Sequence, residues 1–358
     1  MSIYIDFHVL QTVPPSCVNR DDMGSPKTAV YGGSVRARVS SQSWKHAMRK
    51  QFREEFEIGY RTKYMKEAIA DKVQSIKPDL KRDDIEKKVE KILKTKLKDN
   101  GKQKVWFEFE DNEKTKTLFF ISNKQIEMFA KLLIADEDDI KKYRDALKEN
   151  PSVDIALFGR MAASDPTLNY DAAAQVAHAI STHSVQNEYD YFTAVDDLQN
   201  EENAGAGHLG TVEFNSSTLY RYATVNASEL VKTIGAGSTA ETVKKFGQAF
   251  ICSMPTGKEN SFANRTFPDT VYVTIRSDQP VNLCGAFETP IKRSDNGYAE
   301  ASEKRLAEYA EKVYSRFAAE PVKAFCIGDS FADKAVSLPL DELLDELEKA
   351  VDAEINEV

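Results

Sequence analysis

Alternating apolar and polar residues predict the strands of this chain. In residues 2–11, Ile3, Ile5, Phe7 and Val9 occupy every second position, which is the pattern of a strand buried on one face. Four more segments have strand-like composition: residues 35–39, 154–161, 270–276 and 322–327. Two shorter stretches, residues 106–110 and 117–122, are also strand-prone.

A three-to-four residue period predicts the helices. Ser40 or Ser41 can cap a helix that continues through residue 56. The apolar side of this helix would carry Trp44, Ala47, Met48 and Phe52. Its basic side would carry Lys45, Arg49 and Arg53. Further helices are predicted over residues 171–182, 227–253 and 299–319 and in the acidic C-terminal segment.

Two long excursions interrupt this alternation of strands and helices. Residues 59–150 are charged and helical in pattern, which indicates an inserted helical lobe. Residues 189–222 have the pattern of an extended hairpin, with aromatic residues on both legs and a polar, glycine-rich tip. The predicted fold class is therefore α+β, with a sheet-and-helix core and two excursions.

The charge is distributed unevenly along the chain. The formal net charge is −9, and residues 340–358 alone contain eight acidic residues against Lys349. Residues 23–53 contain no acidic residue. They carry seven cations: Lys27, Arg36, Arg38, Lys45, Arg49, Lys50 and Arg53. We interpret this cationic island as the footprint of a nucleic-acid backbone, although a solvated helix face is the simpler alternative. The basic run 77–104 is a weaker candidate for nucleic-acid binding, because it contains six acidic residues beside its eleven cations.

The cysteines and the N-terminus argue against several classes of protein. Cys17, Cys252, Cys284 and Cys326 have no paired short spacing, which argues against a zinc ribbon and a disulfide framework. The start of the chain lacks the features of a signal peptide, and no apolar run approaches the ~20 residues of a membrane helix. We expect a cytoplasmic protein.

Several motifs resemble catalytic or cofactor sites without the context that such sites need. Gly205, Gly207 and Gly210 spell G-x-G-x-x-G, but no buried strand precedes them and no helix follows. His178 and His183 lack the catalytic Glu of a zinc protease, and His178 is expected to be a packed residue of a helix. The adjacent Asp196 and Asp197 are explained as well by a turn. No cofactor and no metal are expected.

Two separate parts of the chain indicate that the protein binds RNA. The helix N-terminus at Ser40, Ser41 and Gln42 can offer backbone N–H groups and hydroxyls to a phosphate. The hairpin aromatics Tyr191 and Phe192 can stack on bases of a single strand. Together these features predict sequence-independent binding.

Several long blocks then resemble one known family. They read FHVLQTVPPSCVNRDDMGSPKTAVYGG, RVSSQSWKHAMRK, DIALFGRMA, HAISTHSV, YFTAVDDL and HLGTVEF. In this order they are similar to the backbone subunit of the type I-E CRISPR surveillance complex, Cascade, the CasC family of the RAMP superfamily. The blocks cover about two-thirds of the chain, and the inserted lobe and the region after Ala227 match poorly.

The resemblance implies an RRM-like (ferredoxin-like) palm, an inserted helical fingers lobe and a β-hairpin thumb. It places the palm at residues 1–58, 183–188 and 225–358, the fingers at 59–182 and the thumb at 189–224. Carried over by motif, the phosphate-gripping residues are Arg20, Lys27, Ser40, Gln42, Lys45 and Arg49. Met161 would press on the nucleic acid near a kink, and the thumb would contribute Phe192, Thr193, Val195 and His208. The sequence departs from the family pattern at His46 and Tyr191.

The function that the resemblance implies is a non-catalytic scaffold. Copies would stack head to tail along CRISPR RNA, present it to target DNA, and join large, small, 5′-handle-binding and RNA-processing subunits. A recruited helicase-nuclease would do the cutting. Related type III subunits use an Asp in the loop between the first strand and the basic helix, and here residues 23–33 lack one, which leaves only Asp21 and Asp22 upstream. One alternative is an endoribonuclease of the same superfamily that uses His8, His46 or His183. A nucleotide-dependent enzyme built on the GAGHLG stretch is the other.

Overall fold

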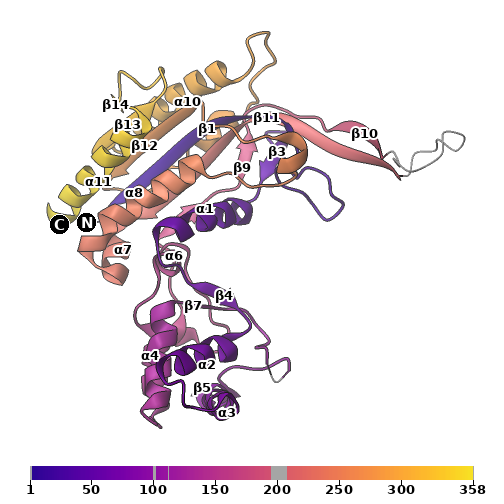
Figure 1. Ribbon diagram of the computed structural model, residues 1–358. Helices are drawn as coiled ribbons and strands as arrows, with labels where there is room; N and C mark the ends of the chain where they lie inside the picture. Colours follow the sequence, from indigo (N-terminus) through magenta and orange to yellow (C-terminus); the bar gives the residue numbers. More distant parts are fainter. Residues whose placement is uncertain (1, 100–101, 112, 195–207, 358) are drawn as a thin grey trace, which may run out of the picture. The chain divides into compact units, whose positions relative to one another are not determined.

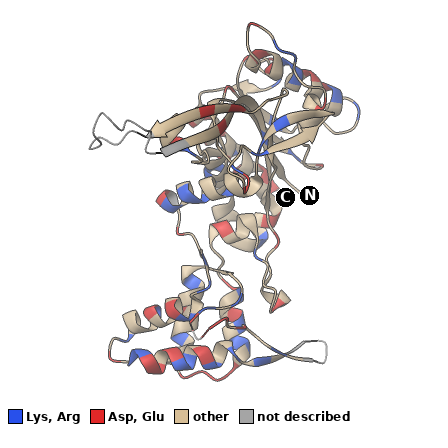
Figure 2. Ribbon diagram, turned by 90° about the vertical axis from the view of Figure 1, so that its right-hand side faces the viewer, with Lys and Arg blue, Asp and Glu red and all other residues tan. Residues whose placement is uncertain are grey.

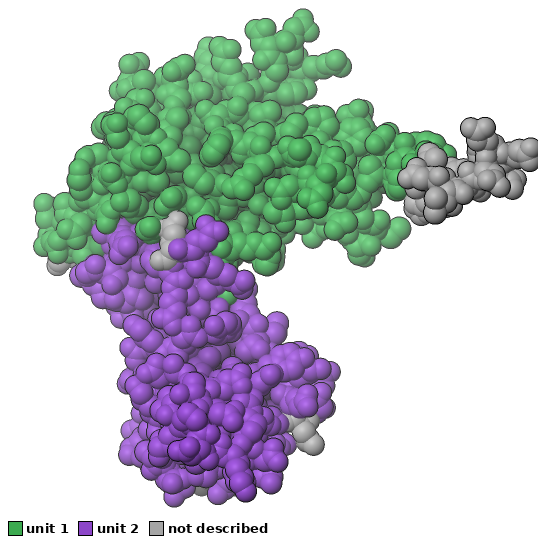
Figure 3. Space-filling model, viewed as in Figure 1, with its two compact units in different colours: residues 1–51, 176–228, 243–358 green, residues 52–175, 229–242 purple. Residues whose placement is uncertain are grey.

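The computed structural model describes residues 2–99, 102–111, 113–194 and 208–357 (Figure 1). The chain forms two compact units, coloured separately in Figure 3. Unit 1 contains Met1–Gln51, Val176–Ser228 and Val243–Val358, and unit 2 contains Phe52–Gln175 and Glu229–Thr242. The chain therefore leaves unit 1 twice and returns twice. The assignment of palm, fingers and thumb to particular residues stays a prediction.

Unit 1 is built on one sheet whose main path has the strand order β14-β13-β12-β1-β11-β9-β3-β2. These strands are β1 (Tyr4–Ser16), β2 (Thr28–Tyr31), β3 (Ser34–Val39), β9 (Ala179–Ser181), β11 (His208–Asn226), β12 (Thr270–Arg276), β13 (Lys323–Ile327) and β14 (Val336–Ser337). Two further strands, β8 (Ala174–Val176) and β10 (Glu188–Ala194), pair with β11 off this path. The first strand, β1, is central and pairs antiparallel with β11 and β12.

Helices cover both faces of this sheet. On one face the Phe7 ring lies 5.6 Å from that of Phe246 in α8 (Ala236–Cys252), beside α11 (Leu340–Glu357). On the other face His8 lies among Tyr220, Tyr222 and Tyr272. The 3-10 helix η3 (Leu283–Phe287) and α10 (Ala299–Tyr314) bury this second cluster. Many RRM domains stack RNA bases on aromatic residues of an open sheet face, but here those aromatics are core residues.

The buried pair Asp6 and His8 predicts an unusual pH dependence of stability. Burial raises the pKa of Asp6 to about 6 and lowers the pKa of His8 to about 3. Between pH 4 and 6 the folded protein keeps the Asp6 proton that the unfolded chain has lost, so this group makes stability fall as pH rises. Between pH 6.5 and 3 the unfolded chain binds a His8 proton that the folded protein excludes, so this group makes stability fall as pH falls.

These two effects oppose each other, each with a slope of about 1.4 kcal/mol per pH unit. The Asp6→Asn variant keeps only the effect of His8. We therefore expect its free energy of unfolding to fall by about 2 to 3 kcal/mol more than that of the original protein as the pH is lowered from 6 to 4. Denaturant unfolding at pH 4, 5 and 6 measures this difference. Parallel losses in the two proteins would show that Asp6 is not protonated in the folded state.

Unit 2 is a helical lobe with two small two-stranded sheets, β4–β7 and β5–β6. Its helices are α2 (Met65–Ile76), α3 (Arg82–Leu93), α4 (Asn123–Ile134), α5 (Ile140–Lys148), α6 (Val153–Phe158) and η1 (Pro166–Leu168). Its strands are β4 (Tyr60–Thr62), β5 (Lys96–Asp99), β6 (Lys102–Val105) and β7 (Phe119–Ile121). Trp106, Phe129 and Tyr143 belong to its buried core. Among the described residues of the whole chain, no helix is long and apolar enough to cross a membrane.

Sequence predictions of secondary structure were wrong in three places. Residues 106–110, predicted as strand-prone, form no strand and contain only an isolated bridge between Phe109 and Thr115. Residues 154–161, predicted as a strand, form most of helix α6, which ends at Gly159 with a φ of 75°. A short apolar run does not distinguish a buried strand from a buried helix. Residues 171–182, predicted as a helix, contain β8 and β9. The small side chains of Ala179 and Ser181 fit a buried strand between β11 and β3, so pairing in the sheet overrides the helix preference of alanine.

Candidate nucleic-acid interface

The N-terminus of α1 (Ser41–Glu55) is capped by Ser40. The Ser40 hydroxyl accepts a hydrogen bond from Ser43 N–H at 3.3 Å, and its own N–H donates to Asn19 Oδ1 at 2.9 Å. The first N–H groups of a helix have no partner within the helix. Within the described residues, no hydrogen-bond acceptor is recorded for the N–H of Ser41 or Gln42. These two groups are therefore positioned to bind an anion.

The apolar side of α1 agrees with the sequence prediction. Trp44, Ala47, Met48 and Phe52 are all buried. In unit 1 the Arg221 guanidinium of β11 lies 3.8 Å from the centre of the Trp44 ring. Arg221 also donates to Gln11 Oε1 at 2.6 Å and to the carbonyl oxygen of Phe250. This contact holds the start of α1 against the sheet.

The cationic island is less exposed than the sequence predicted. Arg36 is fully buried and donates to the carbonyl oxygens of Ser181 at 3.0 Å and Phe287 at 2.9 Å. Arg49 is only 9% exposed and already has an intramolecular partner, so its placement on an open basic side was wrong. The buried arc of α1 is wider than the apolar stripe, and a long arginine stem can pack within it. Gln42 is exposed and Lys45 half-buried.

The loop before β2 positions the next two predicted residues. Arg20 is exposed, and Lys27 is half-buried with its N–H bonded to the carbonyl oxygen of Asn19 at 2.9 Å. Asp21 Oδ1 accepts hydrogen bonds from the N–H groups of Met23 and Ser25, both at 2.9 Å. This carboxylate therefore stabilises the loop. Lys27 and the start of α1 belong to the same unit, as do Arg20, Ser40, Gln42 and Lys45.

The hairpin formed by β10 and β11 carries the aromatic residues. Tyr189 and Tyr191 are 68% and 64% exposed. They share one face because they are two residues apart on β10, whereas Phe192 points to the other face. Phe192 is 43% exposed and lies over Gly210, its cross-strand partner, where even a Cβ would meet the ring at 2.4 Å. The Phe192 ring therefore packs directly on Gly210, the last glycine of the G-x-G-x-x-G motif.

The structure describes the other predicted hairpin residues to different extents. Thr193 is exposed on β10. Val195 lies outside the described residues, and of His208 only the backbone is described, as the first residue of β11.

Met161 lies in unit 2 and is 82% exposed. The preceding Arg160 is buried and donates to the carbonyl oxygens of Leu168 at 2.8 Å, Phe120 at 3.0 Å and Leu147 at 2.7 Å. Burial lowers the pKa of Arg160 to about 10. This anchored arginine holds the neighbouring Met161 side chain at the surface.

Two of the three histidines proposed as catalytic groups are poorly suited to that role. His8 is fully buried, and its low pKa keeps it neutral. Both ring nitrogens of His183 are engaged: Nδ1 lies 2.9 Å from the carbonyl oxygen of Ser184, and Nε2 accepts from Thr218 N–H at 3.1 Å. His46 is exposed. Within the part of the chain that the structure describes, no group of three or more His, Cys, Asp or Glu could hold a metal ion.

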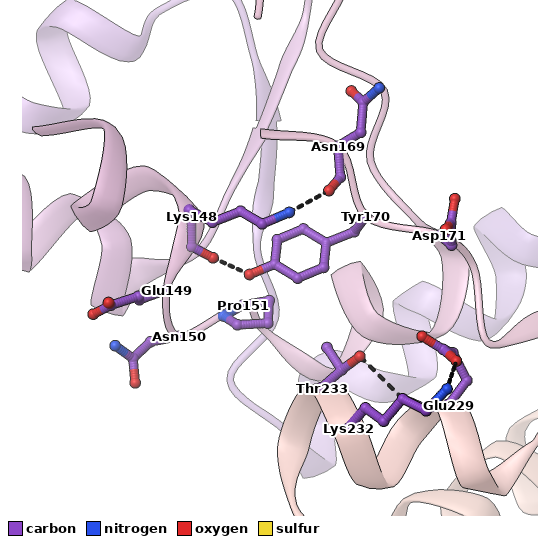
Figure 4. Close-up of a pocket in the computed structure, with 10 residues that line it drawn as sticks. All are labelled: Lys148, Glu149, Asn150, Pro151, Asn169, Tyr170, Asp171, Glu229, Lys232 and Thr233. Atoms are coloured by element: carbon purple, nitrogen blue, oxygen red, sulfur yellow. Dashed lines mark hydrogen bonds and ion pairs between the residues drawn. The ribbon is translucent and has the colours of Figure 1, made fainter. Parts of the chain in front are cut away.

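A pocket of about 600 Å³ in unit 2 offers a different kind of site (Figure 4). Its walls include Lys148 and Lys232 but also Glu149, Asp171 and Glu229. Lys232 pairs with Glu229 at 2.9 Å, and Lys148 Nζ donates to the Asn169 carbonyl oxygen at 2.5 Å. Because its acids outnumber its lysines, this pocket does not fit a polyanion.

The basic run 77–104 of unit 2 is largely neutralised within the protein. Arg82 pairs with Glu86 at 2.6 Å and with Asp71 at 2.5 Å. Lys94 pairs with Glu90. Figure 2 shows Lys and Arg interspersed with Asp and Glu along the helices of this unit. Residues 23–53, which contain no acidic residue, are therefore the better candidate for a nucleic-acid interface.

This chain is similar to one family of sequences and to solved chains of CRISPR surveillance complexes. The sequence model of a family described as CT1975-like protein matches residues 5–351. A solved chain from a "CRISPR RNA-guided surveillance complex, pre-nicking" is 31% identical, with a TM-score of 0.84 over 97% of this chain and 100% of its own. A second, from a "CRISPR RNA-guided surveillance complex", is 29% identical, with a TM-score of 0.63 over 97% and 99% of the two chains. No curated protein matches the sequence significantly.

Proposed function

Because the chain belongs to the CT1975-like family and is a Cascade backbone subunit, we propose that it is a non-catalytic scaffold that binds CRISPR RNA. Copies of the chain assemble head to tail along the RNA and present the guide for pairing with target DNA. The observation that carries this proposal is the cationic segment 23–53, which contains no acidic residue and includes the start of α1, in a chain of this family.

We assign the contacts with the RNA backbone to unit 1. The open N–H groups of Ser41 and Gln42 and the side chains of Arg20, Lys27 and Lys45 bind phosphates. Backbone contacts of this kind are independent of base sequence. A guide-carrying scaffold needs this property, because each guide has a different sequence.

The β10–β11 hairpin is proposed as the thumb, which displaces one guide base at intervals. Its exposed aromatics, Tyr189, Tyr191 and Phe192, support this role because an aromatic ring can replace a neighbouring base in a stack. Met161 presses on the nucleic acid near the displaced base. Unit 2 is proposed as the fingers lobe, and the sheet of unit 1 with its helices as the RRM-like palm.

The partners follow from this role. They are CRISPR RNA, target DNA through pairing with the guide, further copies of the chain, and the remaining subunits of a cytoplasmic surveillance complex in antiviral defence. Cutting is left to a recruited helicase-nuclease. The buried state of His8 and the full engagement of His183 support a non-catalytic chain over an endoribonuclease.

Purification from cells with and without a CRISPR array tests the proposal. We expect RNA of discrete length to co-purify with the chain only when the array is present, together with several copies of the chain. An RNA-free monomer under both conditions would contradict it. Incubation of the purified chain with repeat RNA, with and without divalent metal, tests the alternative, because cleavage products would establish an endoribonuclease.

The salt dependence of binding tests the grip residues. For single-stranded RNA, log K falls with log salt with a slope of about −0.7 per neutralised phosphate. We expect Lys27→Ala with Lys45→Ala to reduce the magnitude of this slope by about 1.4. The matched control removes two exposed lysines from α10 and β13, Lys304→Ala with Lys323→Ala, and should leave the slope unchanged. Equal slopes in both double variants would remove Lys27 and Lys45 from the interface.

A further inference from the structure

Three basic side chains meet at the corner of the sheet where β2, β3 and β9 lie side by side. The β2–β3 register, Thr28 opposite Ala37, places Lys27 opposite Arg38, and Arg38 N–H donates to the Lys27 carbonyl oxygen at 2.9 Å. The β3–β9 register, Val39 opposite Ala179, places His178 opposite the cap residue of α1. Because side chains alternate along strands, Lys27, Arg38 and His178 belong to the same face.

His178 is not the packed helical residue that the sequence predicted. It is an exposed residue immediately before β9, and its Nδ1 lies 3.1 Å from Arg38 Nη1. A guanidinium can only donate hydrogen bonds, so Nδ1 accepts and the ring proton of the neutral histidine is on Nε2. The imidazole therefore keeps one N–H donor available for a ligand.

This corner is electrostatically unfavourable in the free protein. Like charges directly opposite each other on neighbouring strands are destabilising, and neither Lys27 nor Arg38 has an ion-pair partner among the described residues. Burial, then Arg38 from β3 and Lys27 from the preceding loop, lowers the pKa of His178. A bound anion would relieve this repulsion.

We propose that Arg38 and His178, with Lys27, form a phosphate subsite that extends the RNA grip from the N-terminus of α1 onto the edge of the sheet. The ligand is a phosphodiester of the RNA backbone, so this inference rests on the proposed function. Arg38 donates from its free guanidinium N–H groups and His178 from Nε2. Neither residue is among those that the family resemblance assigned to phosphate binding.

A phosphate in this subsite also links RNA binding to a proton. The groups that face His178 are the guanidinium of Arg38 and the ammonium of Lys27. A phosphate offsets both of them, so the pKa of His178 is higher in the complex than in the free protein. Binding then takes up a proton, and RNA binds more tightly as the pH falls from 8 to 6.

The test measures the Kd of the full chain for a short single-stranded RNA at pH 8, 7 and 6 at constant salt. His178→Asn keeps an acceptor for Arg38 but cannot take up a proton. We expect the gain in affinity between pH 8 and 6 to be smaller by about threefold or more in this variant than in the original protein. An equal gain in both proteins would overturn the role of His178.

The second arm uses Arg38→Gln at pH 7. We expect the affinity to fall about tenfold and the magnitude of the salt slope to fall by about 0.7. The matched control is Lys323→Gln on β13, near the opposite edge of the sheet, which should change neither quantity. An unchanged slope for Arg38→Gln, in a variant with unaltered thermal unfolding, would overturn the subsite alone. Failure of the original protein to bind RNA at any pH would overturn the proposed function as well.

Discussion

Alanine at both Tyr191 and Phe192 should weaken the binding of single-stranded RNA by at least about 30-fold without changing its salt slope. Stacking of one base on an aromatic side chain contributes about 1 to 3 kcal/mol. Two such contacts sum to at least about 2 kcal/mol, which corresponds to that factor. The slope should not change because neither side chain neutralises a phosphate. Kd values at four or more salt concentrations measure both quantities.

The matched control is Phe317→Ala, which removes an aromatic residue that is 81% exposed elsewhere in unit 1 and should leave affinity unchanged. If the hairpin variant loses affinity and slope together, the hairpin acts through the cationic surface and not through stacking. If its affinity is unchanged, these aromatics do not contact the RNA in solution.

The second large effect concerns Arg221, which is fully buried. Burial lowers its pKa to about 9. We expect Arg221→Ala to destabilise unit 1 by about 3 to 5 kcal/mol, the range typical of breaking a buried polar network. The substitution leaves Gln11 Oε1 and the Phe250 carbonyl oxygen without this donor and removes the cation from the Trp44 ring.

Trp44 and Trp106 belong to different units, so each can report on the unfolding of its own unit. A Trp106→Phe background leaves Trp44 as the fluorescent probe of unit 1, and denaturant unfolding in this background measures the loss. Arg265→Ala, at an exposed arginine of the same unit, is the matched control and should change stability by less than about 0.5 kcal/mol. A similarly small loss for Arg221→Ala would mean that α1 is held to the sheet mainly by its apolar side chains.

Much of unit 1 could be predicted from local patterns. The strand at residues 270–276 and the buried side of α1 are confirmed because two-residue and three-to-four residue periods survive in the sequence. The hairpin is confirmed as β10 paired with β11. Family membership was also predicted correctly, because it depends on several ordered blocks and not on a single motif.

The burial of individual cations could not be predicted in this way. The acceptors of Arg36, the carbonyl oxygens of Ser181 and Phe287, lie 145 and 251 residues away along the chain. Arg38, only two residues further on, remains half-exposed beside His178. The two arginines look equivalent in the sequence. Only their neighbours in the folded protein show that Arg36 is structural and that Arg38 is a candidate for ligand binding.

The central position of β1 has a consequence for synthesis of the protein. The first strand pairs with residues up to Asn226 on one side and Arg276 on the other. At translation rates of about 5 to 20 residues per second, its second neighbour leaves the ribosome about 15 to 50 s after β1 does. Phe52–Gln175 of unit 2 are complete well before that time. A nascent chain therefore carries an unpaired apolar strand through most of its elongation, and we expect expression yield to depend on chaperones that cover it.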